Sequence, residues 1–215
     1  SDTAESFKQE VNILKKITHS NIVKLIDSGY DDKNKIFYIV MEYIYGPDIK
    51  KYCHNKTTRL IDKLSIFAKL CEVIKFVHSK GIIHRDIKPS NILVEEKEII
   101  DIKLLDFGIS KLFDTLTHGK TCDNKLTRAY MAPEQIERSG ITEQTDIYQL
   151  GITFIELLSE ENDFKDFLTH YDKSTIINKI HQKYKIQDDS GLLSRILEKC
   201  TMIKKDERYE NLQDI

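Results

Sequence analysis

The sequence predicts an α+β fold in which a short strand-containing part comes first and helices form most of the remainder. Three observations support this prediction. Short β-branched runs are confined to the first half of the chain, apolar residues recur with helical spacing over longer segments, and the chain is 40% apolar and 32% charged. A length of 215 residues is enough for one domain with a sizeable core.

The first expected element is a helix near the N-terminus. Phe7, Val11 and Leu14 recur at i, i+4 and i+7, so they share one face of that helix. Glu10 lies beside this apolar stripe. The helix should therefore direct one carboxylate toward the element on which it packs.

Two strands are expected next, over residues 22–26 and 36–41. The turn-forming residues 27–29 and 31–35 separate them, which predicts an antiparallel pair. Gly46-Pro47 then interrupts the chain.

A long amphipathic helix is predicted over residues 59–79, where apolar residues keep helical spacing. Two short β-branched runs, residues 92–94 and 99–105, flank a charged turn and predict a hairpin.

The second half is expected to be helical after a loop-like stretch over residues 110–125. Residues 146–158 are apolar on nearly every side, which is typical of a helix buried all round. Residues 164–215 are predicted to form short helices with polar faces.

Composition limits the partners and the compartment. Lys and Arg number 33 against 35 Asp and Glu, so no bulk attraction to nucleic acid or to an anionic membrane is expected. The longest apolar stretch, residues 150–158, is too short to span a membrane. The four cysteines are far apart, which argues against a zinc site or a disulfide framework and favours a reducing compartment, the cytoplasm.

Three motifs carry the chemistry. Residues 84–91 read His-Arg-Asp-Ile-Lys-Pro-Ser-Asn, residues 106–108 read Asp-Phe-Gly, and residues 132–134 read Ala-Pro-Glu. The first two resemble the catalytic loop and the metal-binding motif of protein kinases, and the third follows at the expected distance. Each alone could arise by chance, but all three in this order could not. The resemblance extends over nearly the whole chain, from the helix carrying Glu10 to Arg208.

The resemblance implies a bilobal kinase fold. Residues 1–43 would form a truncated N-terminal lobe with its hinge, consisting of one helix and two remaining strands, and residues 44–215 would form a mainly helical C-terminal lobe.

The resemblance also implies roles in phosphoryl transfer, where catalysis is mostly positioning and neutralisation of charge. Asp86 would orient the substrate hydroxyl and accept its proton, and Lys88 would steady the transferring phosphoryl group. Asn91 and Asp106 would offer hard oxygen ligands to Mg²⁺. The implied cofactors are ATP and Mg²⁺, and the implied partner is a protein substrate.

By the same resemblance, adenine would lie against the hinge residues Glu42 and Ile44, with Met41 at the back of the pocket and Leu93 beneath the base. Asp48 would face the ribose.

Lys88 and Thr127 match serine/threonine kinases, which favours Ser or Thr over Tyr as the acceptor. Arg85, immediately before Asp86, is typical of kinases controlled by phosphorylation of the activation loop. We expect Asp123 or phosphorylated Thr121 to pair with it.

Other matches are architectural. Glu134 and Arg208 would form a buried ion pair, and Asp146 would hold the backbone of the catalytic loop.

One part of the family pattern is missing from this sequence. No glycine precedes Gly29, and no lysine lies on a strand before Glu10 to pair with it. The chain as given is therefore expected to bind ATP weakly, with truncation or omission favoured over a naturally short kinase. Missing strands or a partner should cover the exposed edge of the strand pair, because a lone two-stranded sheet is marginal in water.

Two alternatives stay open. A pseudokinase scaffold would explain the missing segments but has no need for Asp86, Asn91 and Asp106 together. A small-molecule kinase normally lacks the segment at residues 132–134.

Overall fold

The computed structural model describes most of the chain. The described residues are 11–12, 14–15, 17–31, 33–34, 36–55, 57–95, 100–105, 128–160, 164, 172–184 and 191–215. The expected loop over residues 110–125 and most of the expected first helix lie outside them. Val11 and Leu14, which belong to that helix, are helical and buried.

The first sheet consists of two antiparallel strands, β1 (Leu25–Asp31) and β2 (Ile36–Met41), as the sequence predicted. The start of the first strand was predicted wrongly: β1 begins later than expected and includes residues 27–29, which we had assigned to a turn. Cross-strand pairing explains the difference. Gly29 lies opposite Tyr38, and a Cβ on Gly29 would come within 2.5 Å of the Tyr38 hydroxyl, so this glycine gives the ring room within the ladder.

The second sheet is the predicted hairpin, formed by β3 (Ile92–Glu95) and β4 (Asp101–Leu104). The segment before β1 joins it: Val23 N donates to Leu104 O at 3.0 Å, and Leu104 N donates to Asn21 O at 2.8 Å. Residues 21–24 therefore connect the two hairpins through the backbone.

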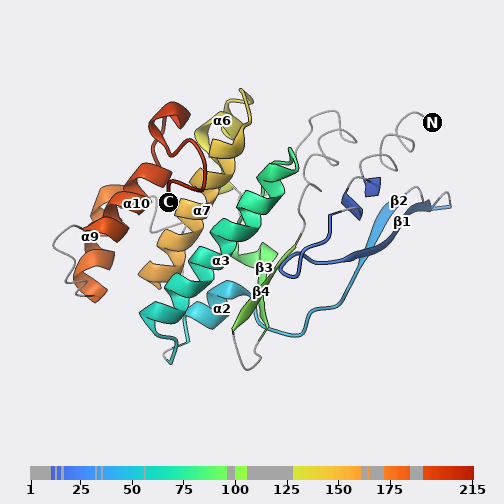
Figure 1. Ribbon diagram of the computed structural model, residues 1–215, viewed down its shortest axis with the longest axis horizontal. Helices are drawn as coiled ribbons and strands as arrows, with labels where there is room; N and C mark the ends of the chain where they lie inside the picture. Colours follow the sequence, from blue (N-terminus) through green and yellow to red (C-terminus); the bar gives the residue numbers. More distant parts are fainter. Residues whose placement is uncertain are drawn as a thin grey trace.

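The helices lie mainly to one side of the sheets (Figure 1). The predicted long helix is confirmed as α3, and the helix expected to be buried all round is confirmed as α7. The helical elements are α2 (Ile49–Cys53), α3 (Leu60–Ser79), η1 (Pro89–Asn91), α6 (Pro133–Ile136), α7 (Glu143–Ser159), α9 (Lys173–Tyr184), α10 (Leu192–Cys200) and η2 (Lys205–Glu207).

The core is centred on α7. Every residue of this helix from Thr145 to Leu158 is buried, because α3, α9 and α10 all pack against it. Phe67 of α3 stacks on Phe154 of α7 with ring centroids 4.2 Å apart. In the described part of the chain, no helix combines the length and the apolar character that crossing a bilayer requires.

One face of β2 is apolar and exposed. Ile36, Tyr38 and Val40 alternate along the strand and are 57%, 44% and 42% exposed, and Ile26 at the bulge of β1 is 57% exposed. Side chains of this kind are normally buried in a protein interior or interface.

Candidate active site

The predicted catalytic loop runs between α3 and β3 and ends in η1. Its central feature is the carboxylate of Asp86. Lys88 Nζ donates to Asp86 Oδ2 at 2.8 Å, and Asn91 Nδ2 donates to the same oxygen at 2.9 Å and to Asp86 O at 2.8 Å. The structure therefore brings together the three residues that the motif assigned to catalysis.

The backbone of this loop is fixed by one buried carboxylate. Asp146, which is fully buried in the first turn of α7, accepts from His84 N through Oδ2 and from Arg85 N through Oδ1, both at 2.8 Å. This is the role that the resemblance implied for Asp146. A buried carboxylate that accepts backbone hydrogen bonds sets the position of the donors closely.

Two further residues of α7 hold the loop from the same helix face. Gln149 accepts from Ile87 N at 3.0 Å and donates to Arg85 O at 3.0 Å, and Thr153 donates to Ile87 O at 3.4 Å. Together with Asp146 they lie at i, i+3 and i+7, so α7 presents one polar stripe to the loop. Arg85 has a φ of +70°, a strained conformation for a non-glycine residue that these contacts stabilise.

Sequence reasoning missed His78 as a member of this network. His78 Nε2 lies 2.8 Å from Asp146 Oδ2, and its Nδ1 lies 3.5 Å from Glu143 Oε2. It follows Ile74 at i+4, on the buried face of α3. His78 ends a run of apolar residues on this helix face, and that placement was the signal that could have identified it.

The predicted nucleotide-binding residues lie in β2, in the segment that follows it and in β3. Met41 ends β2, Glu42 follows it, and Ile44 is buried. Leu93 pairs with Asp48 in a single antiparallel bridge, so the expected floor and the expected ribose-facing residue are neighbours. Asp48 is also the N-cap of α2, and its Oδ1 accepts from Lys51 N at 2.8 Å.

Gly46 permits this close approach of the hinge to the hairpin. A Cβ at this position would lie 1.9 Å from Val94 O, and Val94 N donates to Pro47 O at 2.9 Å. Any side chain at residue 46 would push the hinge away from β3.

The buried ion pair that the resemblance implied is present. Arg208 donates to both carboxylate oxygens of Glu134 at 2.7 and 2.9 Å, and Thr145 Oγ1 adds a third hydrogen bond at 2.8 Å. Burial alone would raise the pKa of Glu134, but the hydrogen bond from Arg208 holds it below its ordinary value. The pair fixes α6 and the following loop against α7.

A third buried carboxylate, Glu156 of α7, contacts the segment that leads into α6. Glu156 of α7 is 1% exposed, accepts from Tyr130 Oη at 2.5 Å and pairs with Lys50 Nζ at 2.7 Å. Burial, and then the charge of Glu156, raises the pKa of Tyr130 above its ordinary value. This contact holds the segment that leads into α6 against α7.

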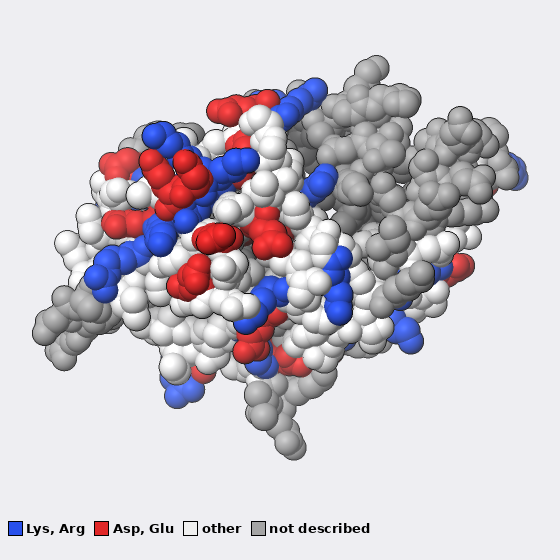
Figure 2. Space-filling view, turned by 45° about the horizontal axis from the view of Figure 1, so that its top comes forward, with Lys and Arg blue, Asp and Glu red and all other residues white. Residues whose placement is uncertain are grey.

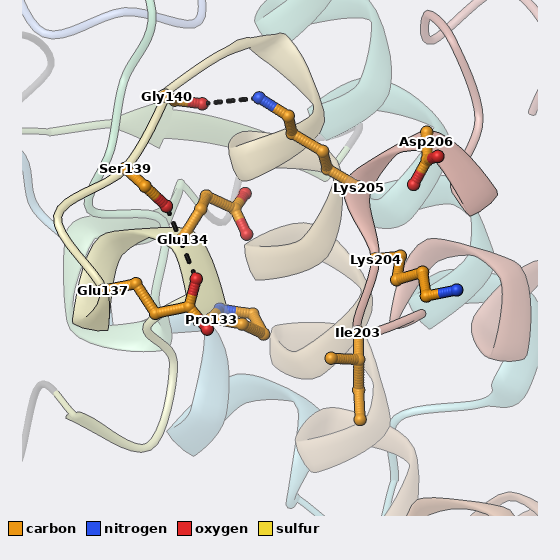
Figure 3. Close-up of a pocket in the computed structure, with 9 residues that line it drawn as sticks. All are labelled: Pro133, Glu134, Glu137, Ser139, Gly140, Ile203, Lys204, Lys205 and Asp206. Carbon is orange, nitrogen blue, oxygen red and sulfur yellow. Dashed lines mark hydrogen bonds between the residues drawn. The ribbon is translucent and has the colours of Figure 1, made fainter.

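A separate pocket of about 330 Å³ lies between α6 and η2. Figure 3 shows Pro133 and Ile203 on its two walls and Lys205 reaching across to Gly140 O, a hydrogen bond of 3.1 Å. None of the predicted catalytic or nucleotide-binding residues lines it. The pocket is therefore distinct from the catalytic loop.

The charges on the surface are mixed. In Figure 2, Lys and Arg side chains alternate with Asp and Glu over the described part of the face shown.

Several predicted site residues lie outside the described residues. They are Glu10, Asp106, Thr121, Asp123 and Thr127. Within the described ranges, no three His, Cys, Asp or Glu side chains are grouped so that they could hold a metal ion.

Comparison with known proteins gives a consistent result. Residues 1–213 match the family model described as protein kinase domain. A probable serine/threonine-protein kinase of Clostridium acetobutylicum is 32% identical over 97% of this chain and 32% of its own length. The serine/threonine-protein kinase PrkC of Bacillus subtilis is 36% identical over 71% of this chain and 23% of its own length.

A eukaryotic relative shows the same pattern: the serine/threonine-protein kinase atg1 of Dictyostelium discoideum is 36% identical over 75% of this chain and 24% of its own length. The chain thus spans a third or less of the length of these relatives. The match of the family model over almost the whole sequence shows that the chain belongs to the protein kinase family.

Proposed function

We propose that the protein transfers the γ-phosphoryl group of ATP to Ser or Thr hydroxyls of a protein substrate, with Asp86 as the catalytic base. One observation carries this proposal: Lys88 and Asn91 both donate to Oδ2 of Asp86, in a loop that a buried Asp146 fixes. No described residue donates to Oδ1 of Asp86, so this oxygen can accept the proton of a substrate hydroxyl.

The residues present fit a magnesium–nucleotide cofactor. Because Nδ2 of Asn91 donates to two oxygens of Asp86, the orientation of the amide is set and its Oδ1 can be offered to a cation. Asn91 and Asp106 would hold Mg²⁺, which neutralises phosphate charge when ATP is bound. Lys88 would supply a positive charge beside Asp86, where negative charge develops during transfer.

The adenine would be bound by Met41, Glu42 and Ile44 over the floor at Leu93, and the ribose by Asp48. Glu10 would complete the site by pairing with a lysine. These assignments rest on the family pattern and on the closeness of Asp48 to Leu93.

Regulation would involve Arg85. Its Nε is buried and has no hydrogen-bond partner among the described residues. A buried donor of this kind costs free energy unless an acceptor reaches it. We propose that Asp123 or phosphorylated Thr121 supplies that acceptor, and that Thr127 contacts the substrate.

Further polypeptide would cover the exposed edge of the β1–β2 pair, and the exposed apolar side chains of Ile36, Tyr38 and Val40 on one face of β2 support additional contacts to this sheet. It would come from the same protein or from a partner. The boundary between a lobe over residues 1–43 and a lobe over residues 44–215, and a location in the cytoplasm, remain predictions.

The test is transfer of labelled phosphate from ATP with Mg²⁺ by the full-length protein, measured on Ser-, Thr- and Tyr-containing peptides. The Asp86→Asn variant should lose activity by at least about 100-fold, the contribution typical of a positioned base. Asp206→Asn, at an exposed position, is the matched control and should remain active. Equal activity of the wild type and Asp86→Asn would contradict the proposal.

A further inference from the structure

The carboxylate of the hinge residue Glu42 has two donors that come from different parts of the chain. Its Oε1 accepts from Lys24 N at 2.9 Å and from Lys103 Nζ at 3.0 Å. The backbone N of Glu42 also donates to Lys24 O at 3.0 Å. The backbone hydrogen bond from Lys24 and, to a smaller extent, the hydrogen bond from Lys103 lower the pKa of the Glu42 carboxyl below its ordinary value. The Glu42 carboxylate is therefore ionised at neutral pH.

Lys103 lies on the floor of the predicted adenine site. It is the cross-strand partner of Leu93 in the β3–β4 pair, and directly opposite residues place their side chains on the same face of a sheet. Its side chain is 14% exposed, against 32% for Glu42. The side chain of Lys103 therefore extends from beside Leu93 to the carboxylate of Glu42.

We propose that Lys103 is a positioning residue of the nucleotide site, which ties the hinge at Glu42 to the floor strand β4 and so sets the space between them. This inference rests on the proposed function, because it takes adenine to lie between hinge and floor. No residue motif in the sequence pointed to Lys103.

The contact with Lys24 joins Glu42 to the backbone of the segment that leads into β1, and this segment is in turn bonded to Leu104 of β4 through backbone hydrogen bonds. Among the described residues, Lys103 is the donor that links the Glu42 side chain to the β3–β4 sheet. Without Lys103 the hinge would keep its ladder contacts but lose its side-chain link to the floor.

The experiment measures binding of a fluorescent ATP analogue with Mg²⁺ by the full-length protein, followed by KM for ATP and kcat. Lys103→Met should weaken analogue binding and raise KM for ATP by about fivefold, as expected for loss of one partly exposed ion pair, while kcat changes little. Lys103→Arg should restore most of the affinity.

The matched control is Lys69→Met. Lys69 also forms an ion pair with a residue of β4, Asp101, at 3.1 Å. Asp101 is the first residue of β4, whereas Lys103 is near the last. Lys69→Met should leave analogue binding unchanged. Glu42→Gln removes the negative charge of the same ion pair as Lys103→Met. In the double variant, its effect on analogue binding should therefore not add to that of Lys103→Met.

The possible results distinguish a failure of the positioning role of Lys103 from a failure of the proposed function. If the wild type binds the analogue and Lys103→Met binds it equally well, or if Lys69→Met weakens binding as much, the positioning role is wrong. If the wild type binds no nucleotide at all, the proposed function fails first. Should Lys103→Met unfold, Glu42→Gln alone decides the question, since its side chain is more exposed.

Discussion

The catalytic loop and the hinge are both short connections, but they are held in different ways. The backbone of the catalytic loop is held by buried polar side chains of one helix: Asp146, Gln149 and Thr153 of α7. The segment around Glu42 depends on backbone contacts and on the partly buried pair of Glu42 and Lys103. Buried hydrogen bonds are costly to break, whereas exposed ion pairs contribute little. The backbone around Asp86 is therefore expected to resist displacement more strongly than the segment around Glu42.

The largest effect should come from Asp146→Asn. Asparagine offers one acceptor oxygen where the carboxylate meets three donors, so at least one buried donor is left without a partner. We expect a loss of about 3–5 kcal/mol in the free energy of unfolding. Activity should also fall, because Arg85 and Asp86 lose their position.

Urea unfolding and phosphate transfer would measure these two effects. Asp214→Asn, at an exposed position, is the control and should change neither. A stable and fully active Asp146→Asn variant would mean that the loop is not held through α7.

Arg208→Met should have the next largest effect, about 3 kcal/mol, because it leaves the buried Glu134 carboxylate without its charge partner. The exposed pair of Lys204 and Glu207 provides the comparison: Lys204 is 73% exposed, and Lys204→Met should cost less than about 0.5 kcal/mol. Thermal unfolding of both variants checks the contrast. Similar costs for the two would remove the distinction between buried and exposed pairs in this domain.

Acid should weaken the same buried pair. Because the folded-state pKa of Glu134 lies below its ordinary value of 4.5, its stabilising contribution is complete above pH 4.5 and is lost as the pH falls below it. Urea midpoints at pH 7 and at about pH 3.5 would show this loss. The loss should be smaller in Arg208→Met, whose Glu134 no longer has a lowered pKa; an equal loss in both proteins would assign the acid sensitivity to other groups.

The smallest effect is expected in the hinge region. Asp48→Ala removes the N-cap of α2 and should cost about 1 kcal/mol of stability. If Asp48 also faces the ribose, KM for ATP should rise as well. Asp172→Ala removes a comparable pair of contacts, to Thr175 at the start of α9, and should cost similar stability without changing KM. If KM for ATP is unchanged in Asp48→Ala, Asp48 caps α2 but does not contact the ribose.

The sequence by itself determined the element types and the composition of the catalytic loop. The helical spacing over α3 and the apolar run within α7 are local patterns, and the motif around Asp86 identifies the family from consecutive residues. Local patterns suffice here because helix burial and turn chemistry depend on near neighbours in sequence.

Only the tertiary structure decided which distant side chains meet. The start of β1 depends on pairing with β2, and the contacts of His78 with Asp146, of Lys103 with Glu42 and of Tyr130 with Glu156 join residues 26 to 68 positions apart. The residues in these contacts give no local signal that identifies the partner, because a buried His or a half-buried Lys is satisfied by whichever acceptor the packing of α3, α7 and the two hairpins brings to it.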